Sequence, residues 1–378
     1  MLTLGEVNKA LGKANESPQE DLVFESIITD SRKADKSSLF VAIKGEALDG
    51  HEFISSALEK GAPFAVAEFL PPNCPPERVL IVPSSKSALL KIAGAYRRKF
   101  SLPLVGVTGS VGKTTTREFI YTVLSAEYKT LENEENLNNE IGVSHRLLQL
   151  NEGYEAAVME MGMDGLGQIE EISAAAFPQI AVITNIGVSH LEKLKTRENI
   201  LKAKTEILLS MEKGSPLIIC ADNDLLSKYE NKDFNIITYG IENKNAMVRA
   251  EGAAAANNGI SFEIISPWGN RRAFIPTHGE HNVLNALASF IVGSLMKIPP
   301  DVIVEALKNY NPVGLRQKFI EKDGITFVAD CYNSAPDSLN AAVKTLVSLP
   351  CHGRRIMVVA DMLELGENAM ELHRNCGR

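Results

Sequence analysis

The loop at residues 108–115 carries glycine at positions 109 and 112 and lies between a short apolar run and a helical pattern. We expect a buried strand at 102–107 and a helix at 114–126, because the first segment is continuously apolar and the second repeats apolar residues with helical spacing. Glycine accepts positive φ, and the first turn of a helix presents unpaired backbone N–H groups. This order of elements predicts a loop that cradles phosphate groups.

The residue types in the loop narrow the prediction to ATP with Mg²⁺. Lys113 supplies a positive charge for the outer phosphates, and the Thr114 hydroxyl is a ligand for Mg²⁺. The strict Walker pattern has glycine where this chain has Val107, so a chance Gly-Lys-Thr sequence is the alternative. The predicted nucleotide-binding residues are Thr108, Gly109, Ser110, Val111, Gly112, Lys113, Thr114 and Thr115.

Strand and helix patterns alternate along the middle of the chain. Further buried strands are expected at 155–160, 180–184 and 217–220, and a helix at 86–99 precedes the first strand. Such alternation predicts an α/β fold with a parallel sheet covered on both faces.

The 378 residues are enough for two to three domains, and we place them at 1–84, 85–312 and 313–378. The last is small, with one expected βαβ unit made of a strand at 325–329, a helix at 336–349 and a strand at 356–360.

Composition excludes some partners. A net charge of −8 argues against a nucleic-acid partner, which usually requires a basic face. No apolar run approaches the length of a membrane span. The five cysteines are odd in number and widely spaced, as expected in a reducing cytoplasm.

Two ionisable residues follow predicted strands, at the edge where ligands of parallel α/β sheets gather. Glu160 ends one strand and is a candidate Mg²⁺ ligand, the alternative being an ordinary surface charge. His190 follows another, and a structural histidine is its alternative.

Lys204 interrupts the apolar stripe of a helix expected at 196–211, with Thr196 as its N-cap. A buried lysine has a lowered pKa, and its neutral amine can react with CO₂ to give an anionic carbamate. The alternative is a lysine that extends from the stripe to solvent.

Asn282 and Asn285 share one face near the start of another expected helix. Two amides on one face could read the edge of a base, whereas Asn282 as a plain N-cap is the alternative.

Taken together, these segments resemble the Mur ligases, the ATP-dependent ligases of peptidoglycan precursor synthesis. The resemblance implies three domains: a small α/β N-terminal domain, a central P-loop ATPase-like parallel sheet and a Rossmann-like C-terminal domain, here shortened. Residues 29–32, 40, 44–45 and 49–51 resemble the family's uridine-nucleotide-binding segments, and 136–142 its muramoyl-substrate segment, with Ser144 in place of the usual proline. The implied substrate-binding residues are Ser31, Arg32, Lys44, Asp49, His51, Asn138 and Asn139.

The resemblance also assigns roles in the second and third domains. Glu160 and His190 correspond to magnesium ligands, and Lys204 to a carbamylated lysine that also serves the metals. Asn282 and Asn285 would contact adenine and nucleotide, and Asp330 would contact ribose or the hinge. Arg316 would face the γ-phosphate, completing an implied catalytic set of Lys113, Glu160, His190, Lys204 and Arg316.

Residues 361–366 are typical of the family member that adds D-alanyl-D-alanine to UDP-MurNAc-tripeptide through an acyl phosphate. We therefore expect ATP and Mg²⁺ as cofactors, these two substrates as partners, and a monomer. Three alternatives remain: a remnant that binds nucleotide and precursor without ligating them, a folylpolyglutamate-type ligase, or a simple P-loop kinase or transport ATPase.

Overall fold

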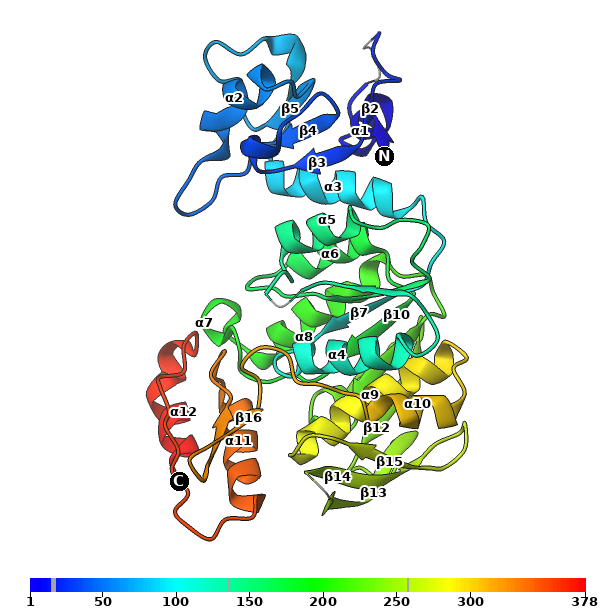
Figure 1. The fold of residues 1–378 in the computed structure, drawn as a ribbon, viewed down its shortest axis with the longest axis vertical. Coiled ribbons are helices and arrows are strands. Elements are labelled where there is room, and N and C mark those ends of the chain that lie inside the picture. Colours follow the sequence, from blue (N-terminus) through cyan, green and yellow to red (C-terminus); the bar gives the residue numbers. More distant parts are fainter. Residues whose placement is uncertain (15–17, 135, 257) are drawn as a thin grey trace. The chain divides into compact units, whose positions relative to one another are not determined.

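The computed structural model describes residues 1–14, 18–134, 136–256 and 258–378. The chain forms two compact units (Figure 1). The first comprises Met1–Ser101, Leu137–Glu152 and Ala174–Phe177, and the second comprises Leu102–Asn136, Gly153–Ser173 and Pro178–Arg378. The domain boundaries expected at 84/85 and 312/313 remain predictions.

The first unit is built on a parallel four-stranded sheet in the order β3-β4-β5-β6. Its core gathers apolar side chains from strands and helices, among them Leu39, Phe64 and Leu89. The elements of this unit are β1 (Leu2–Thr3), α1 (Leu4–Ala10), β2 (Val23–Phe24), β3 (Ser26–Ile28), β4 (Ser38–Val41), α2 (Ile54–Glu59), β5 (Phe64–Ala67), β6 (Val79–Ile81), α3 (Ser85–Arg97) and α5 (Glu140–Leu147).

The second unit contains a nine-stranded sheet in the order β15-β14-β13-β12-β11-β10-β7-β9-β8. The strands from β12 to β8 in that order run parallel, and β13 joins the edge of β12 in the same sense. The strands are β7 (Leu104–Thr108), β8 (Thr130–Glu132), β9 (Ala156–Glu160), β10 (Ile180–Ile183), β11 (Pro216–Cys220), β12 (Asn235–Gly240), β13 (Val248–Ala256), β14 (Gly259–Ile265) and β15 (Arg271–Ile275).

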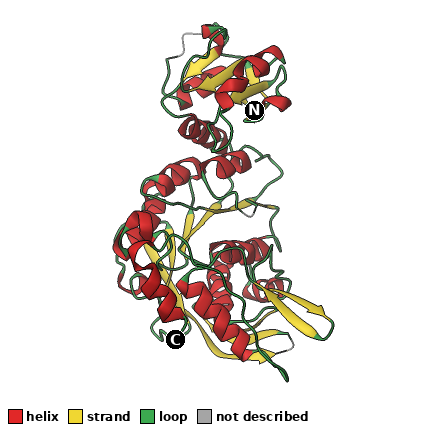
Figure 2. Cartoon of the chain, turned by 90° about the vertical axis from the view of Figure 1, so that its left-hand side faces the viewer, coloured by secondary structure: helices red, strands yellow, loops and turns green. Residues whose placement is uncertain are grey.

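Helices cover this sheet, as the red and yellow elements of Figure 2 show. The helices that contact its strands include α4 (Lys113–Leu124), α9 (Glu280–Leu295) and α10 (Pro300–Leu307). Other helices in this part of the chain are α6 (Gln168–Ala176), α7 (Leu191–Leu194) and α8 (Arg197–Thr205). The expected strands and helices of the central region are thus confirmed. Ends shift slightly, and the helix expected at 196–211 passes after Thr205 into a 3₁₀ turn at Glu206–Ser210. The strands β12 to β15 were not predicted.

The C-terminal segment differs from the expected βαβ unit. It contains an antiparallel hairpin of β16 (Lys318–Lys322) and β17 (Ile325–Ala329), then α11 (Pro336–Ser348) and α12 (Ala369–Cys376). The strand expected at 356–360 is wrong, because this apolar run pairs with no strand among the described residues. Its side chains lie in solvent, with Val358 92% exposed, so the run lacks the packing layer that makes a buried strand favourable.

No helix within the described ranges is both long and apolar enough to cross a lipid bilayer.

Candidate functional site

The carboxyl ends of β7, β9 and β10 lie next to one another, since these strands are parallel neighbours in the sheet. The phosphate loop follows β7, Glu160 ends β9, and the segment leading to His190 follows β10. The sheet therefore brings together the three segments that the sequence placed at one edge, as parallel strand order requires.

The phosphate loop has the backbone that its glycines predict. Gly109 and Gly112 have φ of 145° and 79°, and Gly112 begins α4 without a side-chain cap, which leaves the first N–H groups of the helix for an anion. A Cβ on Gly109 would lie 2.0 Å from Thr184 Oγ1, so space as well as φ demands glycine there.

Residues after β10 support the loop, and sequence reasoning missed them. The Asn185 side chain accepts from the Val111 N–H at 2.9 Å, and the Asn185 carbonyl accepts from the Ser110 N–H at 3.0 Å. Thr184 Oγ1 donates to the Val111 carbonyl at 2.6 Å. These contacts hold the loop in place without a ligand, so less conformational entropy is lost when a ligand binds.

Thr114 and Glu160 form the centre of the predicted magnesium site. The Thr114 hydroxyl donates to Glu160 Oε2 at 2.7 Å, and both side chains are buried. Asn133, another residue that the sequence reasoning missed, holds the Glu160 backbone through two hydrogen bonds of 2.8 and 3.0 Å. A strand-end surface charge does not describe Glu160, which is 2% exposed.

Lys204 lies wholly inside the unit, at 0% exposure. The alternative of a lysine that extends to solvent is therefore wrong. Its Nζ has no hydrogen-bond partner among the described residues. Burial, followed by the nearby positive charge of Lys113, holds the pKa of Lys204 well below its usual value, while the carboxylates of Glu160 and Glu206 act in the opposite direction. A neutral, nucleophilic amine is thus favoured at this position.

His190 lies in the same charged cluster. It adopts a left-handed backbone (φ 63°) immediately before α7, and its Nδ1 lies 2.6 Å from a carboxylate oxygen of Glu364. Burial lowers the pKa of His190, and so does the charge of Lys204. Glu364 was not among the predicted site residues, although its segment had been singled out.

This edge of the sheet offers oxygen donors of the kind that a divalent cation prefers, although no three His, Cys, Asp or Glu side chains among the described residues come together as a metal-holding group. A carboxylate and a hydroxyl already meet at Glu160 and Thr114, and the unpartnered Nζ of Lys204 points to a missing anionic or polar partner. Lys113 reaches the Ser110 carbonyl at 3.2 Å, and burial lowers its pKa, with a further contribution from the nearby charge of Arg316.

The two asparagines are buried on α9, where Asn285 Nδ2 donates to Asn282 Oδ1 at 3.2 Å. The plain N-cap alternative for Asn282 is wrong, because Gly279 occupies that position. The Arg316 guanidinium stacks 4.2 Å above the ring of Tyr332, and Asp330 lies exposed just after β17.

The predicted precursor-binding residues lie in the first unit. Arg32 is exposed, and its guanidinium holds Asp30 through bonds of 2.8 to 3.1 Å, next to the partly exposed Ser31. The backbones of Lys44 and Asp49 pair in an isolated antiparallel β-bridge. His51 differs in character: it is buried, and its two ring nitrogens contact Asp49 Oδ1 at 2.6 Å and the Glu68 N–H at 3.0 Å.

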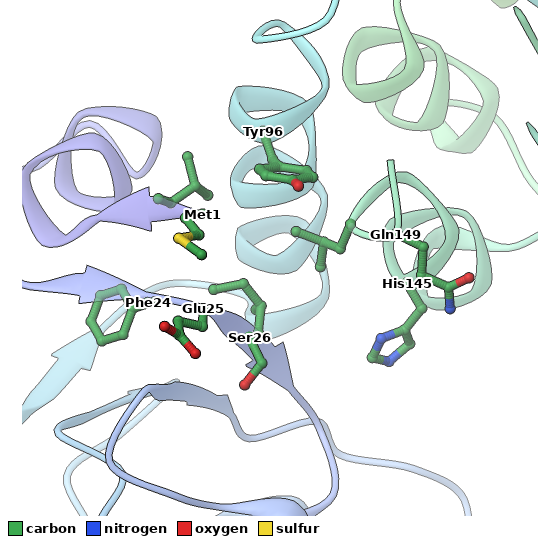
Figure 3. A pocket seen from close by; sticks show the side chains of 10 residues that line it. Met1, Phe24, Glu25, Ser26, Tyr96, His145 and Gln149 are labelled. Atoms are coloured by element: carbon green, nitrogen blue, oxygen red, sulfur yellow. The ribbon is translucent and has the colours of Figure 1, made fainter. Parts of the chain in front are cut away.

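The muramoyl-substrate segment contributes Asn138, which is partly exposed, and Asn139, which caps α5 by accepting from the Gly142 N–H at 2.9 Å. A separate cavity of about 220 Å³ opens in this unit (Figure 3). Tyr96 lies on one wall, and His145 and Gln149 lie on another. None of the predicted site residues lines this cavity.

Comparison with known proteins covers nearly the whole chain. Residues 23–97 match the Mur ligase family, catalytic domain; residues 107–293 match the Mur ligase middle domain; and residues 315–378 match the Mur ligase, glutamate ligase domain.

Similar proteins of known name agree with these matches. The UDP-N-acetylmuramoyl-tripeptide–D-alanyl-D-alanine ligase of Bacillus subtilis is 36% identical over 96% of this chain and 79% of its own length, and that of Escherichia coli is 31% identical over 94% and 79%.

Solved structures show the same relationship. MurF from Acinetobacter baumannii superposes with a TM-score of 0.90 at 30% identity, over 100% of this chain and 83% of its own. MurF ligase from Thermotoga maritima in complex with ADP gives a TM-score of 0.87 at 30% identity, over 94% and 82%. The chain therefore belongs to the Mur ligase family of ATP-dependent ligases.

Proposed function

We propose that the chain joins D-alanyl-D-alanine to the tripeptide of UDP-MurNAc-tripeptide, with conversion of ATP to ADP and phosphate. The observation that carries the proposal is the meeting of the phosphate loop, the Thr114–Glu160 pair and the buried Lys204 at one sheet edge. The substrates follow from the names of relatives that share at least 30% of their residues with this chain over most of its length.

The reaction begins when a carboxylate oxygen of the tripeptide attacks the γ-phosphorus of ATP, and the bond to the β–γ bridging oxygen breaks to release ADP. The amine of D-alanyl-D-alanine then attacks the carbonyl carbon of the acyl phosphate. The tetrahedral intermediate expels phosphate, and the amine loses a proton. Because no protein nucleophile is needed, the residues act by positioning and by neutralising charge.

In this proposal the loop backbone and Lys113 hold the phosphates, and Arg316 neutralises charge that develops on the γ-phosphoryl group. Thr114, Glu160, His190 and Lys204 would hold Mg²⁺, which would supply charge neutralisation between the phosphate oxygens. For Lys204 we propose the carbamate form, in which its neutral amine has added CO₂ and released one proton.

In the first unit, Ser31, Arg32, Lys44 and Asp49 would contact the uridine nucleotide together with His51. The buried His51 would act mainly by shaping the Asp49 turn, since both of its ring nitrogens have protein partners. Asn138 and Asn139 would contact the muramoyl part of the precursor. We expect the chain to act as a monomer in the cytoplasm.

The test is release of ADP with each substrate alone and with both together. The proposal requires ADP and the pentapeptide product only when UDP-MurNAc-tripeptide and D-alanyl-D-alanine are both present. ATP hydrolysis that ignores either substrate would refute it, and turnover with folate and glutamate would instead identify a folylpolyglutamate-type ligase. Calorimetric binding of the precursor without turnover would identify a non-ligating remnant.

A further inference from the structure

The segment between α10 and β16 contains a residue whose conformation is unusual for its type. Gln317, next to Arg316, has φ of 49° and is 7% exposed. A non-glycine residue in the left-handed region is strained, and such strain persists only where the surroundings hold it. In Gln317 the side-chain amide makes the hydrogen bonds that stabilise this conformation.

Two residues at the start of α9 bind this amide. Asn282 Nδ2 donates to Gln317 Oε1 at 2.9 Å, and Gln317 Nε2 lies 3.1 Å from His281 Nε2. Burial lowers the pKa of His281 to about 4, so its ring is neutral near pH 7 and Nε2 can accept a hydrogen bond from the Gln317 amide. Both ends of the amide are therefore engaged.

The hydrogen bonds continue to the phosphate-loop helix. Asn285 Nδ2 donates to Asn282 Oδ1 at 3.2 Å, and Thr116 Oγ1 donates to Asn285 Oδ1 at 2.9 Å. Thr116 is fully buried in the first turn of α4, three residues after Lys113. A buried polar chain thus runs from the linker to the helix that begins at the phosphate loop.

This series of hydrogen bonds also limits how the Asn282 side chain can contact a nucleotide base. Its amide nitrogen has two protons and already has acceptors in the His278 carbonyl at 2.7 Å and in Gln317 Oε1. Both N–H groups of this amide are therefore already used in hydrogen bonds within the protein. Gln317 is the partner that lies on the linker, so the contact between these two amides connects α9 to the linker.

We propose that Gln317 is a positioning residue that ties the linker, and with it Arg316, to the nucleotide site through Asn282. This inference rests on the proposed function, because it assumes that Asn282 and Arg316 act on the nucleotide. The position of the linker is thus coupled to α9 through the Gln317 amide. Loss of this amide would let the linker and Arg316 move, while the phosphate loop would keep its own contacts.

The test replaces Gln317 by leucine, which keeps a similar size but lacks the amide, and by glycine, which accepts the positive φ without strain. Asn311→Leu, at an exposed site in the same linker, is the matched control. We expect both Gln317 variants to lose about tenfold in kcat/KM for ATP, since two hydrogen bonds of ordinary net strength are removed. The control and the affinity for the UDP precursor should stay unchanged.

A double-mutant cycle separates positioning from packing. If Gln317 acts through Asn282, Gln317→Leu should have little further effect on ADP affinity in an Asn282→Ala background. Additive losses, or ADP affinity and kcat/KM equal to wild type in both Gln317 variants, would overturn the proposal. ADP binding is measured by calorimetry without the acceptor substrates, so this readout stands even if the proposed ligase reaction fails.

Discussion

Replacement of Lys204 by methionine should stabilise the unmodified chain and abolish its activity. The side chain is 0% exposed, and Nζ lacks a hydrogen-bond partner among the described residues. An uncompensated buried polar group costs about 1–3 kcal/mol, and methionine of similar length removes that cost without opening a cavity. The free energy of unfolding of the second unit should therefore rise by about 1–3 kcal/mol in the absence of CO₂.

The stabilisation should depend on pH. The pKa of Lys204 is lowered in the folded chain, so between that pKa and its ordinary value the unfolded chain binds a proton that the folded chain does not. The contribution of Lys204 to the free energy of unfolding therefore rises with pH between its folded-state pKa and its ordinary pKa. The methionine variant should lose this contribution, so its advantage over wild type should be largest at the low end of this pH range.

The assay can use the one tryptophan of the chain. Trp268 lies in the second unit, with its ring 6.4 Å from that of Phe290, so its fluorescence during urea unfolding reports on that unit. Wild type and Lys204→Met are compared across pH in CO₂-free buffer. A methionine variant that is less stable than wild type throughout would refute the account of Lys204 as an unpartnered amine.

Added bicarbonate then tests the carbamate. Wild type labelled with ¹³C-bicarbonate should show a carbamate carbonyl signal that Lys204→Met lacks, and its stability should respond to bicarbonate while that of the variant should not. Activity of Lys204→Ala that returns with short carboxylates would support the same role. An absent signal under saturating CO₂ with Mg²⁺ and nucleotide would contradict it.

Three further predictions concern the loop, the metal and the precursor site. Gly109→Ala should abolish ADP binding, measured by calorimetry, and should lower the free energy of unfolding, measured with urea, by about 1–3 kcal/mol through its strained φ alone. The control is Gly165→Ala, where an added Cβ meets nothing within 4 Å, so its effect should be close to zero. Equal effects of the two substitutions would refute the steric argument. Thr114→Val should raise the Mg²⁺ concentration for half-maximal activity whereas Thr114→Ser should not, because only the serine keeps the hydroxyl that contacts Glu160; identical Mg²⁺ titrations would exclude the role. Arg32→Ala should weaken UDP-precursor binding about tenfold, in line with one charge-assisted hydrogen bond, and leave ADP affinity unchanged; a parallel loss of ADP affinity would point to general unfolding.

Local pattern predicted the apolar strands in the middle of the parallel sheet, missed β12 to β15, and failed for one apolar run that has no partner strand among the described residues. The runs that became β7, β9 and β10 are apolar and lie in the middle of a parallel sheet, so burial and pairing agree with their composition. The run at 356–360 is equally apolar but finds neither a neighbouring strand nor a covering layer. An apolar run thus indicates a strand only where the rest of the fold provides its partners.

The site shows the same division. The sequence alone determined the phosphate loop, since glycine at 109 and 112 and the Lys113-Thr114 pair carry their chemistry locally. It also placed Lys204 in an apolar stripe, yet burial or extension to solvent remained open. Only the tertiary structure decided that point, because exposure depends on what packs against the helix.

The supporting residues were beyond the reach of sequence pattern. Asn133 and Asn185 hold Glu160 and the phosphate loop through contacts between segments far apart in the chain, and Gln317 joins the linker to α9 in the same way. A lone amide has no periodicity or spacing that reveals its partner. Its role exists only once the fold has buried it and has offered it a hydrogen bond, which is why the sequence determined the chemistry of the loop and the tertiary structure decided what holds it in place.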